Sequence, residues 1–472
     1  MPSKHEYKRL LLANTISFLK RMRWKVLAFD GKINPSVKNT CGFATSSYPD
    51  SSPDLVQFEK DIISLIRSVE FRSIDNDFQK KMRQDVSDIR ASGKVIVSAD
   101  KSSNMYKLDK ETYKSHLTNS ITSTYKKTTH DKVEEINMSA YHCSAALGLD
   151  KRMEKLQTSE AYITAKDHKE NFNSQLSFRL INPSKTNVGR VSKQMLDEIN
   201  KKLLVEVKTN QWRNTQSVIN RFRDLRGKRH CTFMQFDIDN FYPSISTELF
   251  EKAIHFAREH VEIPDLQLSI IKQARRTLLF HEGEPWCKIG NEGEFDVPMG
   301  SYDWAEVCEL IGIYMLFLAS HVIDSSDIGL YRDDGIVVMH HCGKPEIERK
   351  KKELLKIFKQ NGLSITINAH LHVVQYLDVE LDLRNGQFRP FKKPNNDLLY
   401  INVNSNHPPA VIKQIPENIA HRLSDISSSE EVFARATPEY QAALKSSGFT
   451  GTLKYQPQAQ RQRKRKRKRN VI

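Results

Sequence analysis

The sequence is poor in cysteine, and its six cysteines are scattered along 472 residues without a single Cys-x-x-Cys pair. A disulfide framework and a cysteine-rich zinc site are therefore both disfavoured, and the pattern is typical of a protein kept in a reducing compartment. The adjacent residues His340, His341 and Cys342 do not change this reading. Consecutive side chains of a strand point to opposite faces and cannot close a tetrahedral metal site.

Long apolar runs are also missing. The longest, residues 311–323, has 13 residues and contains a serine and a histidine, which is too short to cross a bilayer. Near the N-terminus, the stretch 10–19 imitates a signal peptide, but Asn14, Thr15 and Ser17 interrupt it and no small-residue cleavage site follows. We therefore expect no membrane span and no secretion, and we interpret the N-terminal stretch as a basic amphipathic helix.

Acidic residues are outnumbered by basic ones, 57 to 73, which gives a net charge of +16. Half of this excess lies in residues 461–469, which contain eight Lys or Arg and no acid. This distribution predicts a nucleic-acid partner, held by a folded basic cleft and by a disordered tail. The tail also resembles a nuclear localisation signal, so we expect the nucleus, and otherwise the cytoplasm. The tail residues predicted to bind nucleic acid are Arg463, Lys464, Arg465, Lys466, Arg467, Lys468 and Arg469.

Two adjacent carboxylates stand out in the segment Tyr331-Arg332-Asp333-Asp334. Apolar runs at 328–330 and 336–339 flank it, which predicts a β-hairpin with the aspartates at its tip. Adjacent aspartates repel one another, so the pair is costly unless a cation neutralises it. Hard oxygen ligands suit Mg²⁺ held by one or two carboxylates plus substrate phosphates. An ordinary hairpin turn at Asp334-Gly335 is the alternative interpretation.

A third carboxylate upstream favours the metal site. Residues 232–237 predict a strand that ends in Asp237, followed by a helix from about Ser246 with apolar residues at helical spacing. One carboxylate at a strand end and two in a hairpin can share a pair of metal ions about 3.5 to 4 Å apart, which is the arrangement used for in-line phosphoryl transfer.

At these residues the chain resembles the reverse transcriptases. Asp237 followed five residues later by Tyr242 matches their first palm motif, residues 297–301 (VPMGS) before an apolar helix match the second, and residues 331–334 match the Tyr-x-Asp-Asp of the third. The resemblance implies an α+β polymerase right hand with fingers, a palm of antiparallel sheet and helices, and a helical thumb.

The flanking segments narrow the resemblance to the Penelope-like retroelements. Their finger motifs are similar to residues 99–101, 162–169 and 178–183, their primer-grip hairpin to residues 376–379, and their thumb to residues 405–409. Two positions depart from the family pattern. Ser102 stands where a glycine is usual, and His370 and His372 stand where the fourth palm motif would place a lysine. Many such elements also carry an endonuclease with paired Gly-Ile-Tyr and Tyr-Ile-Gly signatures, but the tripeptide at 312–314 has no partner and is expected to be core.

The resemblance implies a role for each site residue. Asp237 and Asp333, with Asp334 and the carbonyl of Ile238, would hold two Mg²⁺ ions, with Mn²⁺ as a substitute. Arg179 and Lys166 are candidates for triphosphate contacts, with a solvated basic face as the alternative. His372, in place of the family's lysine, is a candidate to protonate the leaving pyrophosphate, with a surface histidine as the alternative. Gly300 would let the backbone approach the template–nucleotide pair, and Tyr242 would crowd a ribose 2′-hydroxyl. The expected partners are an RNA template, a DNA primer or RNA/DNA hybrid, and dNTPs.

Two alternatives stay open. The first is a catalytically inactive, retroelement-derived nucleic-acid-binding protein, against which all three palm aspartates count. The second is a palm polymerase that uses another template or sugar, against which Tyr242 counts. The predicted regions are an N-terminal helical basic region (1–90), fingers (91–200), palm (201–385), thumb (386–455) and disordered basic tail (456–472). Within them we expect a helix at 55–69, a strand at 94–98, a helix at 347–360, strands at 363–367 and 373–383, and a turn at Asn385-Gly386.

Overall fold

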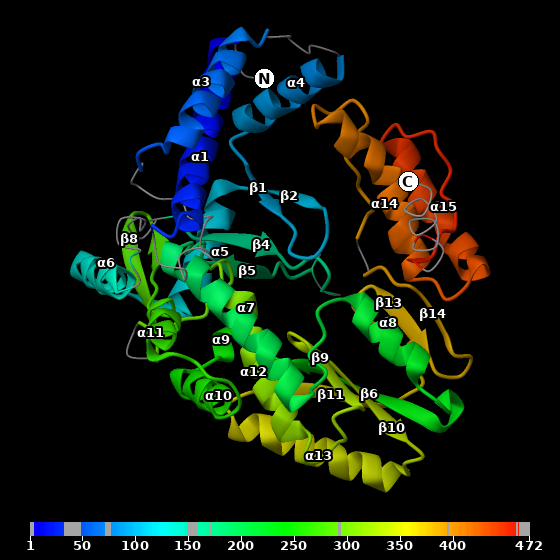
Figure 1. The fold of residues 1–472 in the computed structure, drawn as a ribbon. Helices are drawn as coiled ribbons and strands as arrows, with labels where there is room; N and C mark the ends of the chain where they lie inside the picture. Colours follow the sequence, from blue (N-terminus) through cyan, green and yellow to red (C-terminus); the bar gives the residue numbers. More distant parts are fainter. Residues whose placement is uncertain are drawn as a thin grey trace.

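The computed structural model describes residues 4–32, 49–70, 77–146, 148, 159–169, 172, 174–290, 294–393, 396–458 and 461. Figure 1 shows helices at the N-terminal end of the described chain, a central region of mixed helices and strands, and a helical C-terminal region. None of the helices in these ranges is long and apolar enough to span a membrane. The five described cysteines are free.

A four-stranded antiparallel sheet, which we call the palm sheet, lies at the centre. Its order is β11 (Ile365–Leu371), β6 (Cys231–Ile238), β10 (Asp334–His340) and β9 (Ile328–Tyr331). Apolar side chains of β6 and β10, such as Phe236 and Val337, are buried, because helices cover the sheet. These helices are α7 (Asn187–Val207), α10 (Thr247–His260), α12 (Trp304–Ala319) and α13 (Lys344–Gln360).

Local sequence explains where the palm helices begin. Ser246 accepts a hydrogen bond from the amide of Leu249 at 3.1 Å and so caps α10, as serine does at helix N-termini. The predicted helices after Ser246 and at 347–360 are confirmed, although α13 begins three residues earlier, with Pro345 in its first turn. Gly312 and Ile313 are buried within α12, so the tripeptide at 312–314 belongs to the core as expected.

Smaller sheets lie between the palm sheet and the N-terminal helices. They comprise β1 (Val95–Ser98) with β2 (Met105–Leu108), β4 (Tyr162–Ala165) with β5 (Phe178–Ile181), and β3 (Tyr125–Lys127), β8 (Glu284–Lys288) and β7 (Leu279–His281) in that order. Helices α5 (Lys110–Thr122), α6 (His130–Ala145) and α11 (Asp265–Gln273) adjoin these strands in the chain. Helix α8 (Thr215–Asp224) and the 3₁₀ turn Lys228–His230 precede β6, and α9 (Phe241–Ser244) follows it. The predicted strand at 94–98 is confirmed.

A three-stranded sheet leads from the palm towards the C-terminal helices. It contains β12 (Val373–Tyr376), β13 (Val379–Asp382) and β14 (Gln387–Pro390). The predicted single strand at 373–383 is wrong, because the chain reverses at Leu377, whose φ is +56°. The reversal agrees with the hairpin that the family resemblance implied for this segment. The turn at Asn385-Gly386 is confirmed by a φ of +71° at Gly386.

The two ends of the chain are helical. Helices α14 (Pro409–Asp425) and α15 (Glu430–Ser446) share an apolar core, and α1 (Lys4–Phe29) packs against α3 (Pro53–Ser68), near α4 (Asp77–Ala91). The predicted helix at 55–69 corresponds to α3. The expectation that the N-terminal helix is amphipathic is wrong, because α1 exposes Leu10, Ile16 and Phe18 while it buries Leu19.

Candidate active site

Strand register brings the predicted carboxylates together at one end of the palm sheet. Asp334 at the start of β10 lies opposite Asp237 near the end of β6. The amide of Ile238 donates a hydrogen bond to the carbonyl of Asp333 at 2.9 Å. The hairpin turn therefore holds its two aspartates beside the third, although residues 237 and 333 are far apart in the sequence.

The turn itself comprises Arg332 and Asp333, between paired residues Tyr331 and Asp334. Arg332 has a φ of +56°, the conformation that tight hairpins need at the first turn position. Its guanidinium lies over the Trp304 ring, 4.8 Å from the ring centre, and this cation–π contact anchors the turn to α12. The alternative turn at Asp334-Gly335 is excluded, because both residues belong to β10.

The carboxylates disfavour one another's charge. Asp237 opens towards the cleft, but desolvation by the cleft walls and then the charges of Asp333 and Asp334 raise its pKa to about 6. Burial and then the charge of Asp333 raise the pKa of Asp334 as well. Such mutual repulsion is what a bound cation relieves.

The donor set fits Mg²⁺ bound partly by protein and partly by substrate. Asp237, Asp333 and the backbone of Ile238 line the same cleft, whereas Asp334 is half-buried behind them. Across the described ranges, no group of three or more histidine, cysteine, aspartate or glutamate side chains is arranged to enclose a metal ion. Two carboxylates with substrate oxygens and water suffice for Mg²⁺, which rarely takes an all-protein cage.

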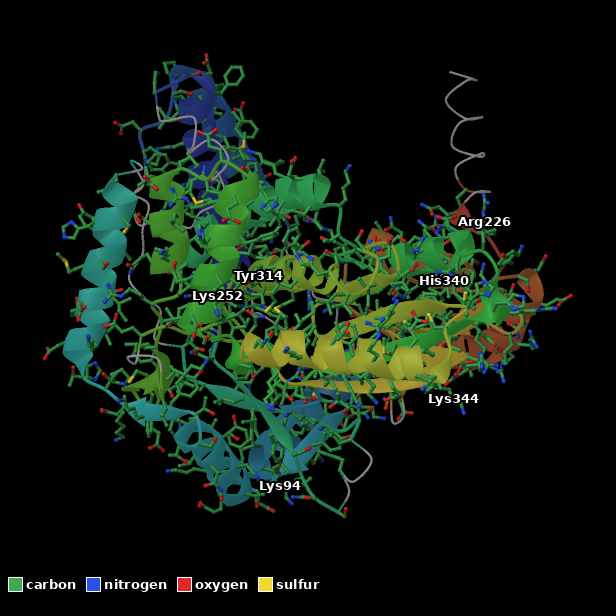
Figure 2. All side chains as sticks on the ribbon, turned by 90° about the horizontal axis from the view of Figure 1, so that it is seen from below. Lys94, Arg226, Lys252, Tyr314, His340 and Lys344 are labelled. Carbon is green, nitrogen blue, oxygen red and sulfur yellow. The ribbon has the colours of Figure 1, made fainter. Side chains whose placement is uncertain are left out.

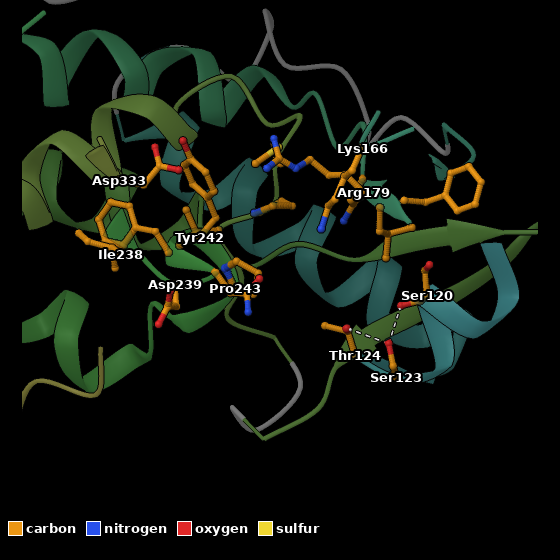
Figure 3. Close-up of a pocket in the computed structure, with 18 of the residues that line it drawn as sticks. Ser120, Ser123, Thr124, Lys166, Arg179, Ile238, Asp239, Tyr242, Pro243 and Asp333 are labelled. Carbon is orange, nitrogen blue, oxygen red and sulfur yellow. Dashed lines mark hydrogen bonds between the residues drawn. The ribbon is translucent and has the colours of Figure 1, made fainter. Parts of the chain in front are cut away.

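The cleft next to the carboxylates has a volume of about 810 Å³ and is lined on its far side by cations. Figure 3 shows Lys166 and Arg179 pointing into it, across from Asp333 and Tyr242. Burial, followed by the positive charge of Arg179, lowers the pKa of Lys166. Lys101, Lys169 and Lys288 also line the cleft.

Arg179 is not a free cation, because it forms an ion pair with Asp100 at 2.9 Å. This pair joins two of the segments that resemble finger motifs. Ser102, at the position where the family usually has glycine, donates a hydrogen bond to Asp167 in the third such segment. The Asn104 amide and the Tyr106 hydroxyl donate to the same carboxylate oxygen at 3.0 Å. The serine is thus accommodated by a side-chain hydrogen bond that a glycine would lack.

Tyr242 lies in the short helix α9 (Phe241–Ser244), shortly after strand β6. Its side chain lines the cleft but is only 8% exposed, and its ring packs edge-on against Trp304, with 4.9 Å between ring centres. Burial raises the pKa of its hydroxyl far above the ordinary value, so the group remains neutral. A rigid aromatic wall therefore flanks the carboxylates.

Gly300 has a structural reason to be glycine that the sequence did not reveal. Its φ is +127°, and a Cβ at this position would lie 2.4 Å from the carbonyl oxygen of Asn182. Close packing against the segment 182–183 therefore requires glycine even without a nucleic acid. The neighbouring residues 297–299 line the cleft.

The structure does not bring His372 to the cleft. Thr366 of β11 pairs with Asp237, but Leu371 pairs with Phe233, four residues further from the carboxylates or about 13 Å along the strand. His372 is exposed beyond that point, and His370 lies 3.1 Å from Glu348 of α13. The pairing of β11 is irregular between Asn368 and Leu371, where His370 has a φ of +61°. This irregularity directs the chain before His372 away from the cleft.

Two further expectations concern residues outside the site. The tail residues 463–469 lie outside the described part of the chain. His340, which Figure 2 shows at the end of the palm sheet near Arg226, contacts Asp327 at 3.0 Å, whereas the ring of His341 stacks on that of His230. The two histidines therefore diverge, as expected, and form no metal site together.

Sequence reasoning missed several cleft residues. Asp239 lines the cleft and accepts hydrogen bonds from Ser364 and Thr366. His168 also lines it, and burial followed by the charge of Lys101 lowers its pKa to about 4. Asp239 could have been noticed two residues after Asp237, but His168 depends on contacts between distant segments.

Comparisons with known proteins support the fold. No family model matches the chain, and no curated protein matches its sequence. Telomerase from Candida albicans, solved with a fragment of telomeric RNA, has 11% identity and a TM-score of 0.54 over 88% of this chain and 70% of that one. Apo telomerase from Candida tropicalis, truncated from its C-terminal domain, has 10% identity and a TM-score of 0.45 over 72% and 77%. The RNA-dependent RNA polymerase of a human picobirnavirus has 9% identity and a TM-score of 0.41 over 86% and 89%.

The first of these likenesses, together with the palm sheet and the helices that cover it, confirms the predicted fold class. The chain has an α+β right-hand polymerase fold. At such low identity the likeness shows the fold alone.

Proposed function

We propose that the chain is an RNA-directed DNA polymerase that extends a primer 3′-hydroxyl by two-metal nucleotidyl transfer. One observation carries the proposal. The hydrogen bond from the Ile238 amide to the Asp333 carbonyl joins the end of β6 to the hairpin tip, so that Asp237 and Asp333 line one cleft opposite Lys166 and Arg179. Facing groups of carboxylates and cations suit a substrate that carries both metal ions and phosphates.

Each residue then has a chemical task. Asp237 and Asp333, with Asp334 and the Ile238 carbonyl in support, would hold two Mg²⁺ ions or, in their place, Mn²⁺. When bound, such ions activate the attacking hydroxyl and neutralise charge on the attacking and leaving oxygens. Arg179 and Lys166 would orient the triphosphate, and Arg179 would exchange part of its pairing with Asp100 for phosphate contacts.

Tyr242 supports DNA rather than RNA synthesis. Its ring packs against Trp304, and the residue lines the cleft together with Asp333, where it would press against the sugar of an incoming nucleotide. A 2′-hydroxyl would clash there, and this group is the difference that lets a protein distinguish ribose from deoxyribose.

The source of the chain is proposed from its flanking segments. The ion pair between Asp100 and Arg179 and the contact of Ser102 with Asp167 join the three segments that resemble Penelope-like finger motifs. We therefore propose a retroelement-type enzyme that acts on RNA templates and RNA/DNA hybrids, and a nuclear location from the basic tail.

Primer extension tests the proposal. Wild-type protein is given a DNA primer on an RNA or a DNA template, with dNTPs or NTPs, and with or without Mg²⁺. Extension of the RNA-templated primer with dNTPs and Mg²⁺ is the expected result. Binding without any extension would favour the inactive alternative, and a preference for NTPs would favour a different palm polymerase.

A further inference from the structure

A buried lysine, Lys288, lies in the lining of the proposed nucleotide cleft. Lys288 ends strand β8, and its side chain is only 8% exposed. Its ammonium donates a hydrogen bond to the carbonyl of Pro243 at 2.9 Å and lies 3.3 Å from the Asp296 carboxylate. A charged lysine is rarely buried unless its charge is paired, so these two contacts account for its presence.

Asp296 extends the contacts into a network. One of its carboxylate oxygens accepts from the Val297 amide at 2.8 Å, and the other accepts from the Tyr125 hydroxyl at 2.6 Å. Tyr125 and Lys288 are also directly paired across β3 and β8. The carboxylate is therefore satisfied on both oxygens, and the network is rigid because its members are buried and hydrogen-bonded.

The network connects two walls of the cleft. Pro243 belongs to α9, whose Tyr242 is the proposed sugar wall, and Val297 begins the loop 297–299 on another side. Figure 3 shows Pro243 next to Tyr242. Helix α9 has four residues, too few to be stable without outside support. A cation on the Pro243 carbonyl therefore limits where the helix can lie.

We propose that Lys288 is a positioning residue for sugar discrimination, which fixes α9, and with it Tyr242, at a set distance from the Val297 loop. The proposal rests on the proposed function and deepens it. Without this tie the Tyr242 ring could retreat, and a ribonucleotide would fit more easily.

The test combines one main variant with two companions. Lys288→Met keeps the aliphatic stem but removes the cation. Tyr125→Phe removes only a hydroxyl at the other end of the network. It replaces Lys288→Met as the test variant if Lys288→Met does not fold. Lys272→Met is the matched control, because it removes a lysine paired with Glu251 at 2.7 Å outside the cleft. Three quantities are measured: amide hydrogen exchange of residues 241–245, equilibrium affinities of a primer–template complex for dGTP and GTP, and their insertion rates.

In Lys288→Met we expect exchange at 241–245 to become at least about fivefold faster, with β6 unchanged. We also expect the preference for dGTP over GTP to fall by at least about fivefold, while Lys272→Met behaves as wild type. Tyr125→Phe should also speed exchange at 241–245 and lower the preference for dGTP, but both effects should be smaller.

Unchanged exchange at 241–245 would overturn the proposal, as would faster exchange with an unaltered sugar preference in affinity and insertion. A wild-type protein that inserts neither nucleotide would refute the proposed function separately. The exchange and the affinity ratio would then still decide whether Lys288 positions Tyr242.

Discussion

Replacing Asp237 by asparagine should make the metal-free protein less sensitive to rising pH. The folded state holds a proton on Asp237 up to about pH 6, whereas the ordinary value is 3.8, so folding binds protons between these values. The sign follows from this linkage: the stabilising proton is present at pH 5 and is lost as pH rises through about 6. Above that pH the carboxylates repel one another, and the variant lacks this repulsion.

The size of the effect can be bounded from the pKa. A shift of about two units corresponds to roughly 3 kcal/mol at most, but Asp237 is open to the cleft and solvent screening reduces the value to about 1 kcal/mol. In a chain of this length, that equals a change of about 1 to 2 °C in Tm. This stabilisation is fully present below about pH 4 and is lost as pH rises through about 6, so between pH 5 and pH 8 the wild type should lose about half of it relative to Asp237→Asn.

Thermal melts of both proteins at pH 5, 6, 7 and 8, with and without Mg²⁺, provide the assay. Mg²⁺ should raise the Tm of the wild type at pH 8 more than that of the variant, since a ligand stabilises the state that binds it. Parallel pH profiles, or an equal response to Mg²⁺, would refute the view that Asp237 belongs to a strained cation site.

Three further predictions concern sugar, backbone and tail. Tyr242→Val should lower the preference for dGTP over GTP in single-nucleotide insertion by at least about tenfold, or roughly 1.4 kcal/mol, and an unchanged ratio in an active variant would mean that Tyr242 is not the sugar wall. Gly300→Ala should reduce the free energy of unfolding in urea by about 2 to 4 kcal/mol, because its Cβ would meet the Asn182 carbonyl. Gly290→Ala is the control, with a φ of +96° and open space around the Cβ, and equal losses would contradict the packing argument. Deleting residues 461–472 should flatten the slope of log affinity for single-stranded nucleic acid against log salt concentration by up to about 5 units, and it should release the protein from the nucleus. An unaltered slope and location would show that the tail neither binds nucleic acid nor directs the protein to the nucleus.

The parts of the fold that local sequence determines were predictable. The hairpin at 331–334, the strand ending near Asp237 and the helix from about Ser246 each follow from spacing within about fifteen residues, and the structure contains all three. That the three aspartates share one site was inferred from their placement on a strand end and a hairpin, and the family resemblance agreed with this inference. The pairing of Asp334 with Asp237 depends on register between strands far apart in the chain.

The rest depended on contacts that no local pattern encodes. Gly300 was attributed to template approach, yet the Asn182 carbonyl already requires glycine there. His372 was placed at the leaving pyrophosphate, but the irregular end of β11 carries it away. Lys288 gave no signal in the sequence, because a single lysine at a strand end resembles any exposed one. Its importance arises from the Pro243 carbonyl, 45 positions earlier.

The central claim is that Asp333 and its neighbours form a polymerase active site, and the most direct measurement is RNA-templated primer extension by Asp333→Asn beside the wild type. The amide keeps the shape of the side chain and removes its charge. The account predicts that the wild type extends the primer with dNTPs and Mg²⁺, and that the variant binds the same RNA–DNA duplex with nearly unchanged affinity but extends it at less than about a tenth of the rate. A variant that retains more than about a tenth of the activity, a loss below roughly 1.4 kcal/mol in barrier, would contradict it.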